Sequence, residues 1–169
     1  MKRKILYGLV IVLVAIQFIR PAKNQSGVVS SNDISKAYTV PAEINLILKK
    51  ACNDCHSNNT VYPWYSNIQP VAWWLQDHVN DGKKHLNFSE FLSYPVKKQY
   101  KKLDEVIETV KEGEMPLNSY TWIHKEAILT ESEKLALSNW AYGIMKQLEA
   151  SNPGIGAKDE AGEGEREKD

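Results

Sequence analysis

Four stretches of the chain carry apolar side chains every three or four residues, which is the spacing of one helix face. They follow Pro41, Pro70, Lys97 and the Thr130–Glu133 pair, and this last pattern is typical of a capping box. The predicted core faces are Ile44, Ile47, Leu48 and Ala51; Val71, Trp74, Leu75, His78 and Val79; Leu103, Val106, Ile107 and Val110; and Leu137, Trp140, Ala141, Ile144 and Leu148. No strand signal stands out, so the pattern predicts an all-α fold.

Glycine and proline mark the predicted ends of these helices. Gly82 suits the end of the second helix, and Gly113 suits the end of the third, which is expected near 97–112. A further short helix is expected over 86–94, where Pro95 closes it. In this layout the first helix ends in a cysteine motif, and the last helix is expected to pack across it.

The N-terminus has the order of charge and hydrophobicity of an export signal. A basic cluster, Met1–Lys4, precedes an apolar run, Ile5–Ile19, that is broken only by Gln17. The run is shorter than the roughly 20 residues of a bilayer span, which favours a cleaved signal. The bulky and charged residues at 18–20 offer no small-x-small cleavage site, which favours an uncleaved anchor. Residues 1–20 are therefore predicted as a signal anchor or signal peptide, with the anchor in the inner membrane and the remaining chain in the periplasm.

The rest of the chain is long enough for about one small domain. Residues 21–40, which include a polar, small-residue stretch, are predicted as a linker that holds the domain away from the membrane. The domain is expected over 41–149, and a disordered acidic tail is expected over 150–169. The formal net charge of the chain is +0, so no nucleic-acid footprint is visible.

The motif that carries chemistry is Cys52-Asn53-Asp54-Cys55-His56, at the end of the first predicted helix. Residues three apart share one face of a helical turn, so both thiols can add to the two vinyl groups of one haem. His56 follows directly and can offer a ring nitrogen to the iron. The chain has 2 cysteines, and one covalent haem c, linked through Cys52 and Cys55, accounts for both. The spacing is the attachment signature of a c-type haem. With the last helix packed across the helix that ends in this motif, the layout predicts a small cytochrome c-like helical domain around a covalent haem.

A C-x-x-C pair also occurs in structural zinc sites and in thioredoxin-like dithiols. Zinc usually takes four ligands from two paired knuckles, whereas this chain has a single C-x-x-C pair. A thioredoxin-like protein would show alternating strands and crossover helices around the motif. The export signal also favours haem, because c-type haem is attached outside the bacterial cytoplasm and an exposed thiol pair there tends to oxidise.

Met115, which Pro116 follows, is the expected sixth iron ligand, because it lies in a loop between a glycine-capped helix and the final helix. A thioether opposite histidine raises the haem potential, which suits an electron carrier. The competing interpretation is a methionine that fills the core. His78 and then His124 are the alternative ligands, and ligation by two histidines would lower the potential. His85 is expected to be exposed to solvent.

Aromatic residues concentrate around the predicted site, where rings exclude water and tune the potential. Those expected to line the cofactor are Tyr62, Trp64 and Trp74, with Tyr65, Trp73 and Trp122 close to them. Trp140 is expected in the core. The second ring nitrogen of His56 needs a partner, and a backbone carbonyl within 62–70 is the expected acceptor.

Several short motifs occur together and in order along the domain. They comprise Cys52-x-x-Cys55-His56-Ser57-Asn58, Thr60-x-Tyr62-Pro63-Trp64-Tyr65, Pro70-Val71-x-x-Trp74-Leu75, His78-Val79, Leu86-Asn87-Phe88-Ser89 and Met115-Pro116. This combination resembles the bacterial haem-binding domain family of short monohaem c-type proteins, over about residues 41–149. The resemblance implies haem, export and sometimes fusion to peroxidase or cytochrome modules, but no known reaction. Phe91 stands where the family suggests tryptophan, and this departure affects no predicted site residue.

Three functions are consistent with these features. The favoured one is a membrane-tethered, one-electron carrier that is not an enzyme, with His56 and Met115 as axial ligands and a redox partner protein of unknown identity. The second is a peroxidase-like enzyme or a gas or redox sensor with an open distal position, where His78 or His124 acts as the acid–base partner. The third is a thiol-redox or metal-binding protein that uses Cys52 and Cys55.

Overall fold

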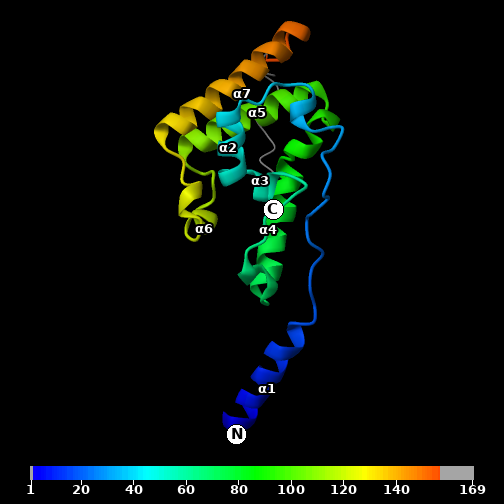
Figure 1. The fold of residues 1–169 in the computed structure, drawn as a ribbon, viewed down its shortest axis with the longest axis vertical. Coiled ribbons are helices and arrows are strands. Elements are labelled where there is room, and N and C mark those ends of the chain that lie inside the picture. Colours follow the sequence, from blue (N-terminus) through cyan, green and yellow to red (C-terminus); the bar gives the residue numbers. More distant parts are fainter. Residues whose placement is uncertain (1, 157–169) are drawn as a thin grey trace.

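The structure, a computed structural model, describes residues 2–156 and shows a helical domain from which one helix extends (Figure 1). The helices are α1 (Lys2–Ile16), α2 (Ala42–Ala51), α3 (Asn53–His56), α4 (Val71–His85), α5 (Val96–Glu112), α6 (Asn118–Thr121) and α7 (Glu131–Ser151), with short 3-10 turns η1 (Ile34–Lys36), η2 (Trp64–Asn67), η3 (Phe88–Ser93) and η4 (Lys125–Ala127). Within residues 2–156 the β contacts amount to one isolated bridge, between Gln25 and Asn59. The prediction of an all-α fold is therefore confirmed.

The hydrophobic core lies where α2, α5 and α7 pack together (Figure 1). Ile47, Leu103 and Leu137 are among its largest fully buried side chains. The other buried apolar members of this cluster are Ile34, Ile44, Leu48, Leu86, Phe88, Phe91, Val110, Leu129, Ala141, Ile144, Met145 and Leu148. The predicted core faces of α2, α5 and α7 thus point into one core, which fixes α2 and the motif that follows it.

The predicted caps of α5 and α7 are confirmed. Thr130 accepts a hydrogen bond from the backbone N–H of Glu133, and the Glu133 carboxylate accepts one from the backbone N–H of Thr130, which completes a capping box. Gly113 follows α5 with φ +79°, a left-handed conformation that glycine adopts without steric cost. The short helix expected before Pro95 is η3.

Gly82 does not end the second predicted helix, because α4 continues to His85. Its position has a packing reason instead. A Cβ at Gly82 would lie 2.8 Å from the carbonyl oxygen and 2.9 Å from the Cβ of Cys55. The absence of a side chain at this position lets α4 approach α3 closely, so the glycine that was interpreted as a helix end is a contact point inside the helix.

The segment predicted as a linker, residues 21–40, packs along the domain. The Asn24 side chain donates to the backbone carbonyl of Ser57 at 2.8 Å and to the hydroxyl of Thr60 at 2.9 Å. Ile34 is 3% exposed and belongs to the core, and η1 contacts η3. The segment is mostly polar, so nothing in the sequence indicated that Ile34 would be buried. The burial of its side chain stabilises the packing of the segment against the domain.

α1 extends from the domain (Figure 1), and the residues that directly follow it bond to the segment that leads into α4. The Gln17 side-chain oxygen accepts a bond from the backbone N–H of Gln69 at 2.9 Å. The backbone carbonyl of Ile19 accepts bonds from the Gln69 side chain at 2.7 Å and from the Trp73 indole at 3.1 Å. Across residues 2–156, no helix combines the length and the apolar character that a membrane crossing requires. The predicted anchor is not confirmed and stays a prediction.

Part of the predicted tail, 150–169, belongs to the folded chain. α7 continues to Ser151, and the backbone N–H of Ile155 bonds to the carbonyl of Asn152 at 3.2 Å. A Cβ at Gly156 would lie 2.7 Å from the hydroxyl of Tyr100 on α5, so this turn lies against the domain. Residues 157–169, where the rest of the predicted tail falls, lie outside the described residues.

Candidate functional site

The cysteine motif forms a tight turn at the end of α2. Cys52 joins α2 to α3, and its carbonyl accepts bonds from the backbone N–H groups of Cys55 at 3.1 Å and His56 at 2.9 Å. Both cysteines are free thiols and half-buried. The turn brings the two thiols to the wall of one hollow, as the helical spacing of the motif predicts.

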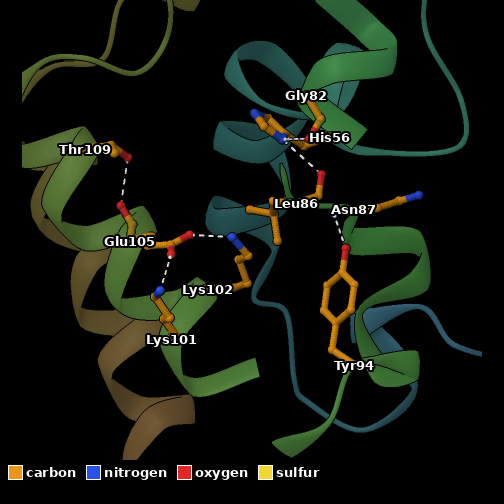
Figure 2. Close-up of polar contacts among 9 residues, drawn as sticks. All are labelled: His56, Gly82, Leu86, Asn87, Tyr94, Lys101, Lys102, Glu105 and Thr109. Carbon is orange, nitrogen blue, oxygen red and sulfur yellow. Dashed lines mark hydrogen bonds and ion pairs between the residues drawn. The ribbon is translucent and has the colours of Figure 1, made fainter. Parts of the chain in front are cut away.

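The ring of His56 is held in one orientation by two backbone carbonyls (Figure 2). Its Nδ1 lies 2.9 Å from the carbonyl oxygen of Gly82 and 3.0 Å from that of Leu86. Carbonyls only accept, so Nδ1 carries the hydrogen and Nε2 keeps a free lone pair. Burial lowers the pKa of His56, which favours the neutral ring that a metal ligand requires.

The prediction that a carbonyl within residues 62–70 accepts the hydrogen bond from His56 was wrong. The acceptors come from the last turn of α4 and from Leu86, the residue that follows it. Because Gly82 has no side chain, α4 lies close enough to α3 for its carbonyl to reach the imidazole. The sequence carried a signal for this contact, since a glycine within a helical pattern often marks a close approach.

Two adjoining hollows meet at the motif. The first, which we term the motif hollow, has a volume of about 160 Å³, and the second, the α5 hollow, has a volume of about 380 Å³. Both are lined by Ala51, Cys52, His56, Asp81, His85, Met115 and Pro116. Their walls are mainly apolar, and the larger volume lies within the range of small-molecule and cofactor sites.

Met115 lies on the wall of both hollows, together with His56. It follows the end of α5, where its backbone N–H bonds to the carbonyl of Thr109 at 3.2 Å, and its side chain is half-buried against the core. The structure thus brings Met115 together with Cys52, Cys55 and His56, from segments about sixty residues apart in the sequence.

The two alternative histidine ligands lie in different places. His78, on α4, lines the motif hollow, and its Nδ1 donates to the carbonyl of Trp74 at 2.9 Å. His124 has both ring nitrogens engaged, with Nε2 2.8 Å from the hydroxyl of Tyr65 and Nδ1 3.2 Å from the carboxylate of Glu126. His124 lines a separate hollow, which Asp54 and Cys55 of the motif also line, and it does not line the motif hollow. Of the two alternative ligands, His78 therefore shares a hollow with His56 and His124 does not.

That separate hollow, which we term the aromatic hollow, has a volume of about 80 Å³ and an almost entirely apolar wall. The predicted core face of α4 lines it, namely Val71, Trp74, Leu75, His78 and Val79. Val71 and Trp74 are 37% and 49% exposed, while Ala72, Gln76 and Val79 are the buried positions of α4. The apolar face of α4, which was predicted to lie in the core, therefore mainly lines the aromatic hollow.

The predicted aromatic residues are divided among three environments. Trp74 borders the aromatic hollow and lies with its ring 4.3 Å from that of His78. Tyr62 lines neither this hollow nor the motif hollow, because its hydroxyl accepts from the backbone of Asn24 and donates to Gln76. Trp64 is 75% exposed. Of the three aromatic residues predicted to line the cofactor, Trp74 alone borders one of these hollows.

Sequence analysis missed a polar pair beside the motif. The Tyr120 hydroxyl donates to the Asp54 carboxylate at 2.8 Å, and both residues line the motif hollow and the aromatic hollow. Burial and this hydrogen bond raise the pKa of Tyr120, so its hydroxyl stays protonated. Asp54 lies inside the motif, but its partner comes from α6, and no local pattern links the two residues.

Polar and charged residues of α5 line the α5 hollow across from His56 and Leu86 (Figure 2). The Lys102 ammonium lies 2.7 Å from the Glu105 carboxylate, and the Thr109 hydroxyl donates to the Glu105 backbone carbonyl at 2.8 Å. All three residues line the hollow. Sequence analysis assigned α5 only a core face, and a Lys–Glu pair three residues apart is too common on helices to signal a site.

The two thiols are protonated at neutral pH. Burial raises the pKa of Cys52 to about 12 and that of Cys55 to about 11. The charge of the neighbouring thiolate adds to the shift of Cys52, and the charge of Asp54 adds to that of Cys55. Within residues 2–156, no three His, Cys, Asp or Glu side chains group in a way that would hold a metal ion.

Comparison with known proteins gives the class of this chain. A family model described as a haem-binding domain matches residues 11–142, which is most of the chain. The protein therefore belongs to this haem-binding domain family, and the resemblance drawn from the short motifs is confirmed at that level. The match begins before Pro41, in accord with the packing of residues 24–40 on the domain. No curated protein and no solved structure matches the chain.

The residues around the motif suit a haem. An imidazole with a fixed Nδ1–H and a free Nε2, a thioether and two thiols line the same hollow. The thiols suit covalent attachment to haem vinyl groups, the imidazole suits an axial ligand, and apolar walls suit the macrocycle. The family and the donor set together support haem as the cofactor of this domain.

Proposed function

We propose that this protein transfers single electrons through one haem c, linked covalently to Cys52 and Cys55, with His56 and Met115 as the axial ligands. The observation that carries the proposal is the oriented His56 ring, which keeps its Nε2 free and belongs to a residue that lines the motif hollow with Cys52, Cys55 and Met115. The haem would supply a one-electron couple, and a thioether opposite imidazole favours a raised potential.

The chain's own residues have separate tasks in this proposal. The carbonyls of Gly82 and Leu86 hold the imidazole in its neutral, Nδ1-protonated tautomer, which directs Nε2 away from α4. The half-buried Met115 offers a soft sulfur. Leu86 and Phe88 contribute apolar surface to the α5 hollow and exclude water from it. No residue is assigned a catalytic step, and the redox partner would be a protein.

We further propose that the protein is exported and tethered to the inner membrane by its apolar N-terminal segment, with the domain in the periplasm. The segment 5–19 carries one polar residue, Gln17, and follows three basic residues. α1 has 15 residues, which corresponds to about 22 Å at a rise of about 1.5 Å per residue. Local thinning of the bilayer and snorkelling of the flanking basic side chains accommodate a short segment.

A second candidate function is a haem sensor or peroxidase-like protein with an exchangeable iron position. It is favoured by three groups that line the motif hollow together with His56, namely Asp54, His78 and Tyr120. Such groups supply the hydrogen bonds and protons that an open distal site uses. Ready binding of carbon monoxide to the reduced wild-type protein would favour this candidate over an electron carrier.

The raised pKa values of the thiols argue against a third function, a dithiol redox protein. Reactive cysteines in such proteins have lowered pKa values, because the thiolate is the nucleophile. Here burial raises the pKa of Cys52 to about 12 and that of Cys55 to about 11.

Covalent attachment is the direct test of the proposal. The denatured full chain, run on a gel, should keep haem-dependent peroxidase staining, and the double variant Cys52→Ala, Cys55→Ala should lose it. Met115→Ala is the matched control, since removal of an axial thioether leaves both thioether links intact. Haem that acid–acetone extracts from the wild-type protein would refute covalent attachment.

A further inference from the structure

Two segments of the domain lack charged side chains. Residues 60–76 and 115–124 contain no Asp, Glu, Lys or Arg, although these types make up 25% of the whole chain. The same two segments hold four of the 5 tryptophans, namely Trp64, Trp73, Trp74 and Trp122. A run of 17 residues without a charge is unusual for the surface of a domain with this composition.

Large apolar side chains of these segments are exposed. Trp122 is 78% exposed, and Trp64 is 75% exposed. The other exposed apolar residues of the two segments are Val61, Ile68, Val71, Trp73, Trp74, Leu117 and Ile123. Single exposed apolar residues are normal, whereas a group of them with no charge between them indicates a surface that meets something apolar.

The two segments form one end of the domain. Val61 and Trp74 from the first segment, and Leu117 and Ile123 from the second, line the same aromatic hollow. In Figure 1 the N-terminal end of α4 and the α6 region both lie toward α1, on the side away from α5 and α7. We term residues 60–76 and 115–124 together the charge-free end.

The residues that directly follow α1 are hydrogen-bonded to the charge-free end. The Ile19 carbonyl accepts bonds from Gln69 at 2.7 Å and from the Trp73 indole at 3.1 Å, and Gln17 pairs with the backbone of Gln69. Ile19 lies three residues beyond the end of α1. If the apolar segment enters a lipid bilayer, Gln69 and Trp73 therefore lie next to the point where the chain leaves the hydrocarbon region.

We propose that the charge-free end lies in the headgroup region of the lipid bilayer that α1 enters, an inference that rests on the proposed tether. Tryptophan suits this region, because its ring is apolar and its indole N–H is polar. Arg20 follows the apolar segment directly and Lys23 comes three residues later, and both suit anionic headgroups at the same level. The bonds to Ile19 hold the charge-free end next to the apolar segment. The linker prediction, in contrast, holds the domain away from the membrane.

The proposal fixes how the candidate haem site faces the membrane. Asp54, Cys55, His78, Leu117 and Tyr120 line both the motif hollow and the aromatic hollow. The motif hollow therefore adjoins the membrane-facing end, while the α5 hollow and its charged wall lie on the α5 side of the motif. A redox partner in the membrane would approach by the first side and a soluble partner by the second.

A crosslinking experiment on the full chain tests the proposal. The photoreactive residue p-benzoylphenylalanine would replace Trp64 or Trp122 in separate variants, reconstituted in vesicles of phosphatidylethanolamine and phosphatidylglycerol. Tyr142 on α7, which is 52% exposed, is the matched aromatic control, and Val10 reports on α1 itself. After illumination, mass spectrometry should find phospholipid adducts at positions 10, 64 and 122 and none at position 142.

The other outcomes separate this inference from the tether. Lipid adducts at position 10 alone would overturn the inference and leave the tether standing. An absence of lipid adducts at position 10 would overturn both proposals. Crosslinks from positions 64 and 122 to a second copy of the chain would show that protein covers the charge-free end, which also overturns the inference.

Discussion

Gly82→Ala tests the close contact on which the position of His56 depends. The new methyl group would lie 2.8 Å from the Cys55 carbonyl oxygen, 2.9 Å from its Cβ and 3.2 Å from its carbonyl carbon. Two of these atoms belong to the backbone, so no side-chain rotation relieves the clash and α3 must move away from α4. The carbonyl of Gly82 would then move away from the Nδ1 of His56.

The magnitude follows from a comparison with a second helical glycine. Gly143 lies in α7, and a Cβ there meets nothing within 4 Å. Both substitutions gain the helix propensity of alanine, worth about 0.8–1 kcal/mol. Only Gly82→Ala overpacks, at a cost of about 1–3 kcal/mol. The free energy of unfolding of Gly82→Ala should therefore be about 1–3 kcal/mol below that of Gly143→Ala.

Urea unfolding of the full chain, followed by tryptophan fluorescence and circular dichroism, measures this difference. In thermal unfolding the gap between the two variants should be roughly 2–4 °C for each kcal/mol in a chain of this length. Gly143→Ala should exceed the wild type in stability. Equal stabilisation by both substitutions would refute the close contact of α3 with α4, and with it the explanation for the orientation of His56.

The remaining predictions concern the sixth ligand, the N-terminal segment and acid stability. If Met115 binds iron, the oxidised protein should show a weak far-red sulfur-to-iron band that Met115→Ala removes and His78→Ala keeps. A high-spin shift in His78→Ala, with no effect of Met115→Ala, would instead assign the sixth position to His78. Ile34→Ala should lower the free energy of unfolding by about 2–5 kcal/mol, because Ile34 is a core residue, whereas the exposed Val29→Ala should change it by less than about 0.5 kcal/mol. Hydrogen bonds from Lys50 and from the Thr130 backbone lower the pKa of Glu133 in the folded state. The ionised carboxylate therefore stabilises the fold at pH values above the ordinary carboxyl pKa, and this stabilisation is lost as pH falls through the lowered pKa. The stability gap between the wild type and Glu133→Gln should accordingly shrink on acidification, and a gap that grows would contradict this sign.

The parts of the fold that the sequence predicted have local causes. The capping box at Thr130, the left-handed Gly113 and the apolar face of α5 each depend on residues within a few positions of one another. The cysteine motif is local in the same sense, since one helical turn sets the relation between Cys52 and Cys55. These features were predicted at their observed positions because short-range geometry determines them.

The parts that were not predicted depend on contacts between distant segments. Ile34 lies in a polar stretch, and only the core formed by later helices gives it a buried place. The acceptors of His56 come from 26 and 30 residues further along the chain. Tyr120 reaches Asp54 across 66 residues. No periodicity encodes such pairs, and Gly82 alone gave a sequence signal, which helix-end chemistry explained equally well.

The two carbonyls that hold His56 make the electron density of its ring insensitive to side-chain substitutions that leave the backbone path unchanged. Nδ1–H donation enriches the imidazole in electron density, and an electron-rich ligand favours the more highly charged state of any metal bound at Nε2. The acceptors belong to the main chain, so a new side chain at position 86 leaves the carbonyl in place. Under the proposed ligation, substitutions would therefore retune the site through the ligand opposite His56, while the histidine side would change only when the path of the backbone changes.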